Sequence, residues 1–245
     1  MFYVSIMYKN DHFKNMEYEF WFMVDLEEWA KERPMFTLNE AERATEIGRE
    51  YLRKKLSRMV RDERLYRIER GKYTFHDDPM IYATHIQKPS YLSFWSALSY
   101  YNLTTQQPTK IQVVSGKRHE DLEDFEFTFS KNMFGFRKDR YNGFEINVAE
   151  KEKLLIDVLM SDKVPLDELK ELFEEVEVEK TVQYARKADR NSVKKRLGFL
   201  FENIVGEEIL ELQVKDGNYP LLDLTKPEKG YKSSKWGLVV NNSAF

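Results

Sequence analysis

The first third of the chain has the apolar spacing of short helices followed by a hairpin. Apolar side chains recur at helical spacing over residues 17–34, where a proline ends the pattern. Thr37 and Glu40 have the spacing of a capping box, which predicts a second helix beginning near Leu38. Gly48 is expected to separate this helix from the next, because glycine permits the turn between two helices.

Residues 49–61 predict a third helix with one buried face. Its apolar side chains fall on a single stripe, at positions i, i+4, i+7 and i+8: Leu52, Leu56, Met59 and Val60. Residues 64–68 and 72–75 are rich in aromatic and β-branched side chains, with Gly71 between them, a pattern that predicts a β-hairpin. Helix, helix, basic helix and hairpin is the order of elements in a winged helix-turn-helix.

The remainder of the chain predicts a mixed domain of helices and strands. Residues 79–90 are expected to be a connection, and we place a winged-helix domain with an N-terminal helical extension at 1–82 and a second domain at 83–245. Helices are expected over the segments 91–103, 150–160, 165–176 and 191–205. Strands are expected over the segments 110–115, 124–130, 144–149, 219–224 and 235–242. The predicted fold class is therefore α+β, with an N-terminal winged helix-turn-helix domain followed by a mixed α+β domain.

Positive charge is concentrated in the third helix and the hairpin. Residues 43–72 contain eleven basic and five acidic residues, a net charge of +6, although the whole chain carries −3. The rest of the chain is therefore acidic, with a net charge of −9. A segregated basic patch of this kind is typical of proteins that bind a polyanion, and a solvated helix face is the alternative interpretation.

The residues expected to contact DNA lie on the two elements that a winged helix places against the duplex. In this class the third helix enters the major groove, and the hairpin, or wing, lies along the phosphates. The expected contacts on the helix are Arg49, Arg53, Lys54, Ser57, Arg58 and Arg61. The expected contacts on the wing are Arg67, Arg70, Gly71 and Lys72, where the glycine allows close approach of the backbone to a phosphate.

The composition and motifs of the chain argue against several kinds of catalytic or metal site and against secretion or membrane insertion. The chain has no cysteine, which excludes disulfides, cysteine-ligated metals and thiol nucleophiles. The sequence also contains no glycine-rich phosphate loop and no Gly-x-Ser-x-Gly elbow. No apolar run approaches the roughly 20 residues that span a membrane. The first residues do not have the pattern of a signal peptide, so we expect a cytoplasmic location and no membrane partner.

Acidic residues and histidines do not form a recognisable catalytic or metal site. Glu152 and Asp157 are five residues apart and would not share a helix face, so we expect structural roles for them. The segment EVEVEK (175–180) approaches the carboxylate-and-lysine pattern of metal-dependent nucleases, but no lysine follows a glutamate by two positions. His76 and His85 do not have the spacing of a helical ligand pair. We therefore expect no metal, no other cofactor and no catalysis.

Several segments, in their order along the chain, resemble the AbiE-type (abortive infection) antitoxin family of transcriptional regulators. They cover the chain from about Met35 to Asn242. The segments are LSRMVRDERLYRIERGKYTF (56–75), PSYLSFWSALSYYNL (89–103), KIQVVSGKR (110–118), VAEKEKLLIDVL (148–159) and KWGLVVNN (235–242). Within the fourth segment, the residues similar to a helix motif of the family are Glu152, Lys153, Leu155 and Asp157.

The resemblance implies a regulator with two roles. The winged helix would bind double-stranded operator DNA and repress its own transcription unit. The second domain would counter a nucleotidyltransferase-type toxin, as the antitoxin of a type IV toxin–antitoxin pair, and would serve partner binding or self-association into a homodimer. Two alternatives stay open from the residues alone. One is a metal-dependent nuclease with a winged-helix DNA reader, and the other is a protein-interaction adaptor whose basic face meets an acidic partner.

Overall fold

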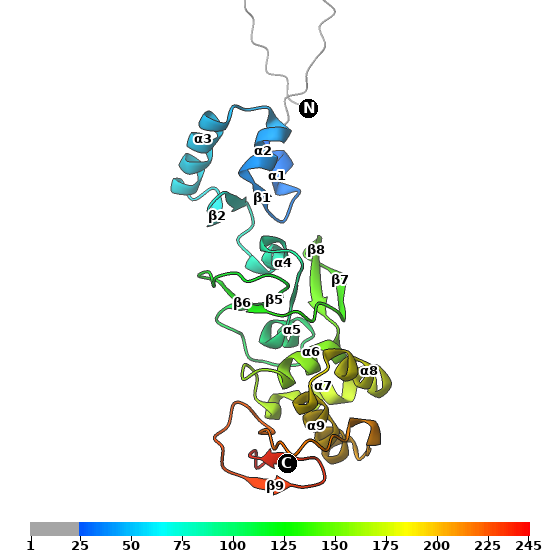
Figure 1. The fold of residues 1–245 in the computed structure, drawn as a ribbon. Coiled ribbons are helices and arrows are strands. Elements are labelled where there is room, and N and C mark those ends of the chain that lie inside the picture. Colours follow the sequence, from blue (N-terminus) through cyan, green and yellow to red (C-terminus); the bar gives the residue numbers. More distant parts are fainter. Residues whose placement is uncertain (1–24) are drawn as a thin grey trace, which may run out of the picture.

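The elements follow one another down a single axis, from a small N-terminal domain to the C-terminal strands (Figure 1). The computed structural model describes residues 25–245. Buried apolar side chains form two clusters along this axis, a smaller one within residues 26–73 and a larger one within residues 81–240. The chain therefore folds around two hydrophobic cores, and the smaller of them belongs to the N-terminal domain.

The N-terminal domain combines short helices with a three-stranded sheet in the order β1-β3-β2. Its elements are α1 (Leu26–Lys31), β1 (Phe36–Thr37), α2 (Leu38–Thr45), α3 (Arg49–Arg61), β2 (Tyr66–Glu69) and β3 (Lys72–Thr74). The capping box of α2 is confirmed, because Glu40 Oε2 accepts from the Thr37 N–H at 2.7 Å and Thr37 Oγ1 accepts from the Glu40 N–H at 3.2 Å. The helix expected over residues 17–34 lies partly outside the described residues, and its described end is α1.

The turn between α2 and α3 differs from the expectation for Gly48. This glycine has φ −57° and is the N-cap of α3, so it does not use the freedom that only glycine has. The left-handed residue that ends α2 is Glu46, with φ 55°. The predicted third helix is confirmed with its bounds. Its buried stripe consists of Leu52, Leu56 and Met59, with Val60 half-buried at the edge.

The larger domain is built on a five-stranded sheet in the order β6-β5-β4-β8-β7. Its strands are β4 (Ser90–Leu92), β5 (Ile111–Ser115), β6 (Phe125–Phe129), β7 (Phe136–Tyr141) and β8 (Phe144–Ala149). The β4–β8 and β5–β6 pairs are parallel, and the β4–β5 and β7–β8 pairs are antiparallel. The α+β class is therefore confirmed, and the sheet is of the mixed type.

Helices pack around this sheet and continue beyond it toward the C-terminus (Figure 1). They are η1 (Pro79–Ile81), α4 (Ala83–Ile86), α5 (Phe94–Tyr100), α6 (Lys151–Leu159), η2 (Leu166–Leu169), α7 (Lys170–Glu175), α8 (Val178–Ala188), α9 (Asn191–Leu200), η3 (Phe201–Val205) and η4 (Leu210–Leu212). Within residues 25–245, no helix is both long enough and apolar enough to cross a membrane.

The segment between the two domains is more structured than its sequence predicts. Residues 79–90 do not form a simple connection but contain η1, α4 and the first residue of β4. Ile81, Tyr82 and Ile86 are buried in the larger cluster, which explains why this segment folds against the second domain. The division of the chain at residue 82 stays a prediction.

The apolar segment that follows is divided between a strand and a helix. A single helix is expected over residues 91–103, but Tyr91 and Leu92 are fully buried in the central strand β4 and the helix begins at Phe94. A continuous apolar run does not distinguish a buried strand from a buried helix, which is why the periodicity is misleading here. The pattern also does not predict β7, whose sequence FRKDRY is mostly charged, or α8.

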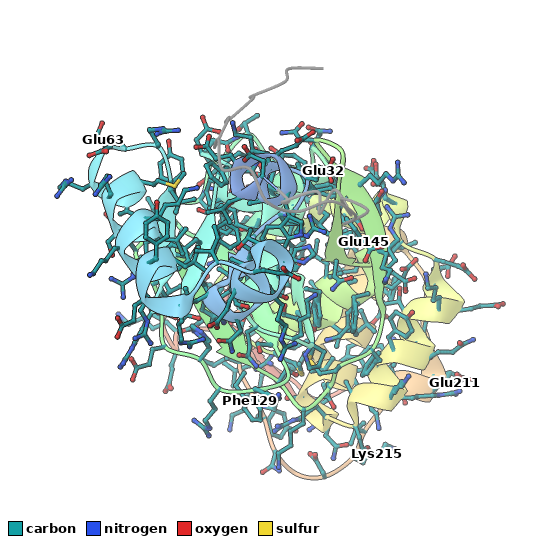
Figure 2. The ribbon with its side chains drawn as sticks, turned by 90° about the horizontal axis from the view of Figure 1, so that it is seen from above. Glu32, Glu63, Phe129, Glu145, Glu211 and Lys215 are labelled. Atoms are coloured by element: carbon teal, nitrogen blue, oxygen red, sulfur yellow. The ribbon has the colours of Figure 1, made fainter. Side chains whose placement is uncertain are left out.

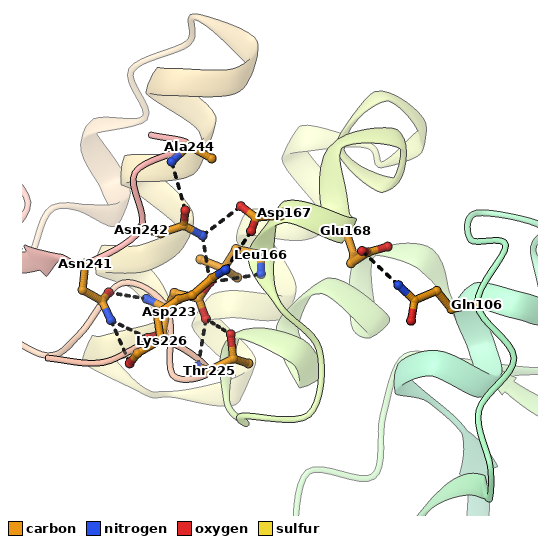
Figure 3. Close-up of polar contacts among 10 residues, drawn as sticks. All are labelled: Gln106, Leu166, Asp167, Glu168, Asp223, Thr225, Lys226, Asn241, Asn242 and Ala244. Carbon is orange, nitrogen blue, oxygen red and sulfur yellow. Dashed lines mark hydrogen bonds and ion pairs between the residues drawn. The ribbon is translucent and has the colours of Figure 1, made fainter. Parts of the chain in front are cut away.

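The C-terminal segment is held by a polar network around the buried Asp223 (Figure 3). The Asn241 side chain accepts from the Asp223 N–H at 2.9 Å, and the Asn242 side chain donates to the carboxylates of Asp223 and Asp167, both at 2.9 Å. The strands β9 (Tyr231–Ser233) and β10 (Leu238–Val240) pair with each other. The strand expected over residues 219–224 is reduced to a single bridge to β10.

The hairpin of β2 and β3 rests against the second domain. The amino group of Lys72 donates to the backbone carbonyl of Ile86, and Glu69 Oε2 lies 3.4 Å from Nε2 of His119. The side chain of Ile68 packs against the larger cluster. Contacts from both domains therefore set the orientation of the hairpin.

Candidate nucleic-acid interface

The polar face of α3 is turned toward solvent. Because its apolar stripe packs into the smaller cluster, the side chains between the stripe positions point outward. Figure 2, seen from above the N-terminal domain, shows this helix at the margin of the molecule with its side chains projecting into open space. The exposed side chains include all six residues predicted on this helix: Arg49, Arg53, Lys54, Ser57, Arg58 and Arg61.

The β2–β3 hairpin forms a wing whose turn carries positive charge. Gly71 has φ 80° and nothing within 4 Å of the position of a Cβ, so the turn requires glycine for its backbone conformation alone. Arg67 and Arg70 are exposed, whereas Tyr73 is buried and stacks on Phe36 with ring centroids 5.9 Å apart. The buried aromatic residue holds the hairpin on the domain while its arginines face solvent.

A groove of about 690 Å³ lies between α3 and the wing. It is lined by Thr37, Leu38, Asn39, Arg49, Arg53, Ser57, Arg67, Arg70, Gly71, Lys72 and Tyr73. Five of these eleven residues are arginine or lysine, and none is acidic. The fold thus brings seven of the ten predicted residues to one concave surface. The other three, Lys54, Arg58 and Arg61, lie on the exposed face of α3 outside the groove.

The cations of the groove differ in how far neighbouring carboxylates neutralise them. Arg49 donates to a glutamate of α2 at 2.5 Å, and Lys72 contacts Glu69 at 2.6 Å. Within the described part of the chain, three groove arginines form no ion pair within 4.0 Å: Arg53, Arg67 and Arg70. These three arginines are therefore the groove cations most available to a phosphate or a base.

Two polar residues of the groove are absent from the predicted contacts. Thr37 and Asn39 lie at the start of α2, and Asn39 accepts a hydrogen bond from Arg49 at 2.8 Å. The capping box locates the start of α2 in the sequence, but it does not predict that this end of the helix approaches α3. The approach depends on how the helices pack in the smaller core.

The acidic residues of α6 have structural partners, in agreement with their predicted role. Lys153 and Asp157 form a buried ion pair one turn apart, and Asp157 also accepts from Tyr91 Oη at 3.0 Å and from Ser93 Oγ at 2.9 Å. Glu152 is directed toward α8 instead, with a lysine of that helix 3.1 Å away. The side chains of Glu152 and Asp157 therefore do not converge.

The structure offers no support for the nuclease alternative. The segment 175–180 ends α7 and begins α8, so its glutamates are not carried on a strand. Among the described residues, no three His, Cys, Asp or Glu side chains are grouped so that they could hold a metal ion.

The fold and the groove together define a winged helix-turn-helix, a class of domain that binds DNA through its third helix and its wing. Residues 24–76 match the family described as "Transcriptional regulator, AbiEi antitoxin". The N-terminal domain is therefore similar to a family of antitoxin transcriptional regulators, and the predicted resemblance is confirmed over this segment. The match supports the general role of a DNA-binding regulator.

A solved structure has a similar fold over most of the length of this chain. The crystal structure of RV2827C protein from Mycobacterium tuberculosis is similar with a TM-score of 0.61, over 87% of this chain and 89% of that chain. The sequence identity is 12%, so the similarity is one of fold. No curated protein shows significant similarity to the sequence.

Proposed function

We propose that this protein is a cytoplasmic autorepressor that binds the promoter of its own transcription unit through α3 and the wing. The observation that carries the proposal is the groove between these elements, which gathers five cations and no acidic residue. A chain with a net charge of −3 attracts DNA only where it concentrates positive charge, and the groove is such a place.

The two sides of the groove have different tasks in this proposal. On α3, Arg53 and Ser57 lie one turn apart and face the groove, where an arginine can donate two hydrogen bonds to a guanine in the major groove. On the wing, Arg67 and Arg70 neutralise phosphates and release counterions. The helix thus supplies sequence choice and the wing supplies affinity. A promoter covered in this way is closed to RNA polymerase.

The test replaces the exposed cations of α3. Arg53 and Arg58 changed together to glutamate should weaken binding to the upstream duplex by about 100-fold or more, because two phosphate or base contacts become repulsive. Fluorescence anisotropy with a labelled duplex, repeated over a series of salt concentrations, measures the affinity and its salt dependence. Circular dichroism of the variant checks that the helices are retained.

The matched control places the same change in charge on the second domain. Lys215 and Lys229 are exposed and lie far along the chain from the groove, so their double change to glutamate should leave binding within about twofold of the unchanged protein. The proposal is wrong if the Arg53/Arg58 variant binds as tightly as the unchanged protein. It is equally wrong if both double variants lose affinity to the same extent.

We further propose that the protein is the antitoxin of a type IV pair whose toxin is a nucleotidyltransferase. The description of the family matched by residues 24–76 supports this role. A second support is the resemblance to the same family that the sequence of the second domain predicts. Co-expression with a nucleotidyltransferase encoded by a neighbouring reading frame should restore growth of cells that the toxin arrests. The Arg53/Arg58 variant should restore growth equally well, because the neutralising role is assigned to the second domain. If the unchanged protein restores no growth, the antitoxin role is excluded and the DNA-binding role is unaffected.

A further inference from the structure

A second cavity, of about 530 Å³, lies within the larger domain and has no part in the proposed DNA interface. It is bounded by the end of β6 and the residues after it, the end of α6 and the start of α9. Its lining combines two kinds of side chain. Three are cations, Lys131, Arg190 and Arg196, and three are large and apolar, Phe94, Phe129 and Met160.

Arg196 is the unusual member of this lining because its charge is buried without a carboxylate partner. The side chain is 5% exposed, and its Nε and Nη1 donate to the backbone carbonyls of Leu221 and Leu159, both at 2.7 Å. No carboxylate of the described residues lies within 4.0 Å of it, and Asp223 acts on it only from a greater distance. Burial lowers the pKa of Arg196 to about 10, so the group remains charged near neutral pH. A buried charge without a counter-ion in contact is costly, which favours binding of an anion beside it.

One terminal nitrogen of this guanidinium has no partner in the described part of the chain. Nη2 has no hydrogen-bond partner among the described side chains and carbonyls, whereas every fully buried side-chain nitrogen in residues 25–245 has one. Arg196 is one of the residues that line the cavity, and an Nη2 without a partner is not among the fully buried nitrogens, so it retains some exposed surface. A donor with a fixed position and an unused N–H is the kind of group that holds an oxyanion.

The other charged residues of the lining leave the cavity with an excess of positive charge. Asp157 is the one acidic residue of the lining, and its charge is already compensated by Lys153. Arg190 and Lys131 are exposed, and neither forms an ion pair in the described part of the chain. Arg190 is also the residue before α9, so the positive end of that helix dipole lies at the lining of the cavity.

We propose that this cavity binds a small organic phosphate. The phosphate group is held between Arg196 and Arg190, and the less polar part of the ligand lies against Phe94, Phe129 and Met160. Inorganic phosphate would use only the cations of the cavity, whereas a nucleotide or a sugar phosphate has a second part that fills the remaining volume. The ligand therefore combines one phosphoryl group with an organic group of about the size of a nucleoside or a hexose.

The test uses the full-length protein and isothermal titration calorimetry. The probes are inorganic phosphate, AMP and glucose 6-phosphate, together with adenosine and glucose as the parents that lack the phosphate. At least one organic phosphate should bind with a Kd below about 1 mM and at least about tenfold more tightly than inorganic phosphate. Its parent should show no measurable binding. Comparison of AMP with glucose 6-phosphate shows whether the apolar side chains of the cavity accept a nucleoside or a hexose.

Variants at exposed and buried positions of the lining assign the binding to this cavity. Arg190→Glu should weaken binding of the organic phosphate by about tenfold or more, since it removes a charged hydrogen bond and adds repulsion. Lys229→Glu, an equal change of charge outside the lining, should leave the Kd unchanged. Arg196→Met should abolish binding. If that variant does not fold, as judged by circular dichroism, the Arg190→Glu and Lys131→Glu variants decide the question.

Three results would overturn the proposal. The first is the absence of binding for every phosphate probe, and the second is equal binding of a phosphate and its parent. The third is an Arg190→Glu protein that binds like the unchanged one, which would leave Arg196 as a structural clamp between two carbonyls. No DNA is involved in these measurements, so their outcome is independent of the proposed repressor activity.

Discussion

Gly198 is a residue whose identity only the packing explains. It lies inside α9, where glycine lowers helix stability by about 1 kcal/mol relative to alanine. The indole of Trp236 covers it so closely that an added Cβ would come within 2.1 Å of the ring. Trp236 is 1% exposed and also donates to the side chain of Glu202. Glycine at this position therefore lets the C-terminal segment dock on the helix.

Alanine at position 198 should consequently destabilise the protein, although alanine is the better helix former. We expect Gly198→Ala to lower the free energy of unfolding of the second domain by about 1–3 kcal/mol, the usual cost of overpacking. Urea denaturation followed by circular dichroism measures the change. Gly48→Ala is the control, because Gly48 has φ −57° and nothing within 4 Å of a Cβ, so its effect should be limited to about 0.5–1 kcal/mol, the loss of a favourable N-cap residue. Equal effects of the two substitutions would contradict the packing argument.

At the scale of elements, the wing combines a left-handed turn, a buried aromatic anchor and exposed arginines. Its two ends are not equivalent. Arg70 lies at the turn and lines the groove, whereas Arg64 precedes β2 and pairs with Glu27 of α1 at 2.5 Å. The two arginines therefore offer a matched comparison between the turn of the hairpin and the residues just before it.

Arg70→Ala should weaken DNA binding by a similar factor for all duplex sequences, because a phosphate contact carries no base information. The slope of log K against log salt concentration should fall by about 1. Arg64→Ala should leave both the affinity and the slope nearly unchanged, since its charge is already paired outside the groove. Anisotropy titrations at several salt concentrations distinguish the two variants. A smaller salt slope for the Arg64 variant than for the Arg70 variant would exclude the wing assignment.

At the scale of the whole molecule, two hydrophobic cores are joined by a short segment and a small contact. Between the wing and the second domain this contact consists of the Lys72 hydrogen bond, the Glu69–His119 pair and the packing of Ile68. Interfaces of this kind couple domains weakly. The two cores should therefore unfold as separate units.

Differential scanning calorimetry should accordingly show two transitions rather than one. Leu56→Ala removes a fully buried side chain of the smaller core and should destabilise that domain by about 2–5 kcal/mol, which lowers only one of the transitions. Gly198→Ala should lower only the other. If either substitution shifts a single common transition, the wing contact couples the two domains more strongly than its size indicates.

Local sequence patterns predict the N-terminal domain well, because the forces that shape it act between near neighbours. The capping box at Thr37, the apolar stripe of α3 and the glycine turn of the wing each depend on residues only a few positions apart. The charge of residues 43–72 is likewise a property of the sequence alone. These features predicted the class of the domain and all of the side chains proposed to contact DNA.

Only the tertiary structure decided which of these side chains meet and which are already neutralised. The groove exists because α3 and the wing pack on one core, and the same packing pairs Arg49 with α2 and Lys72 with the second domain. In the second domain, the strand at Tyr91, the glycine beneath Trp236 and the buried charge of Arg196 depend on partners tens of residues away. Periodicity reports which face of an element is buried, but it carries no information about what covers that face.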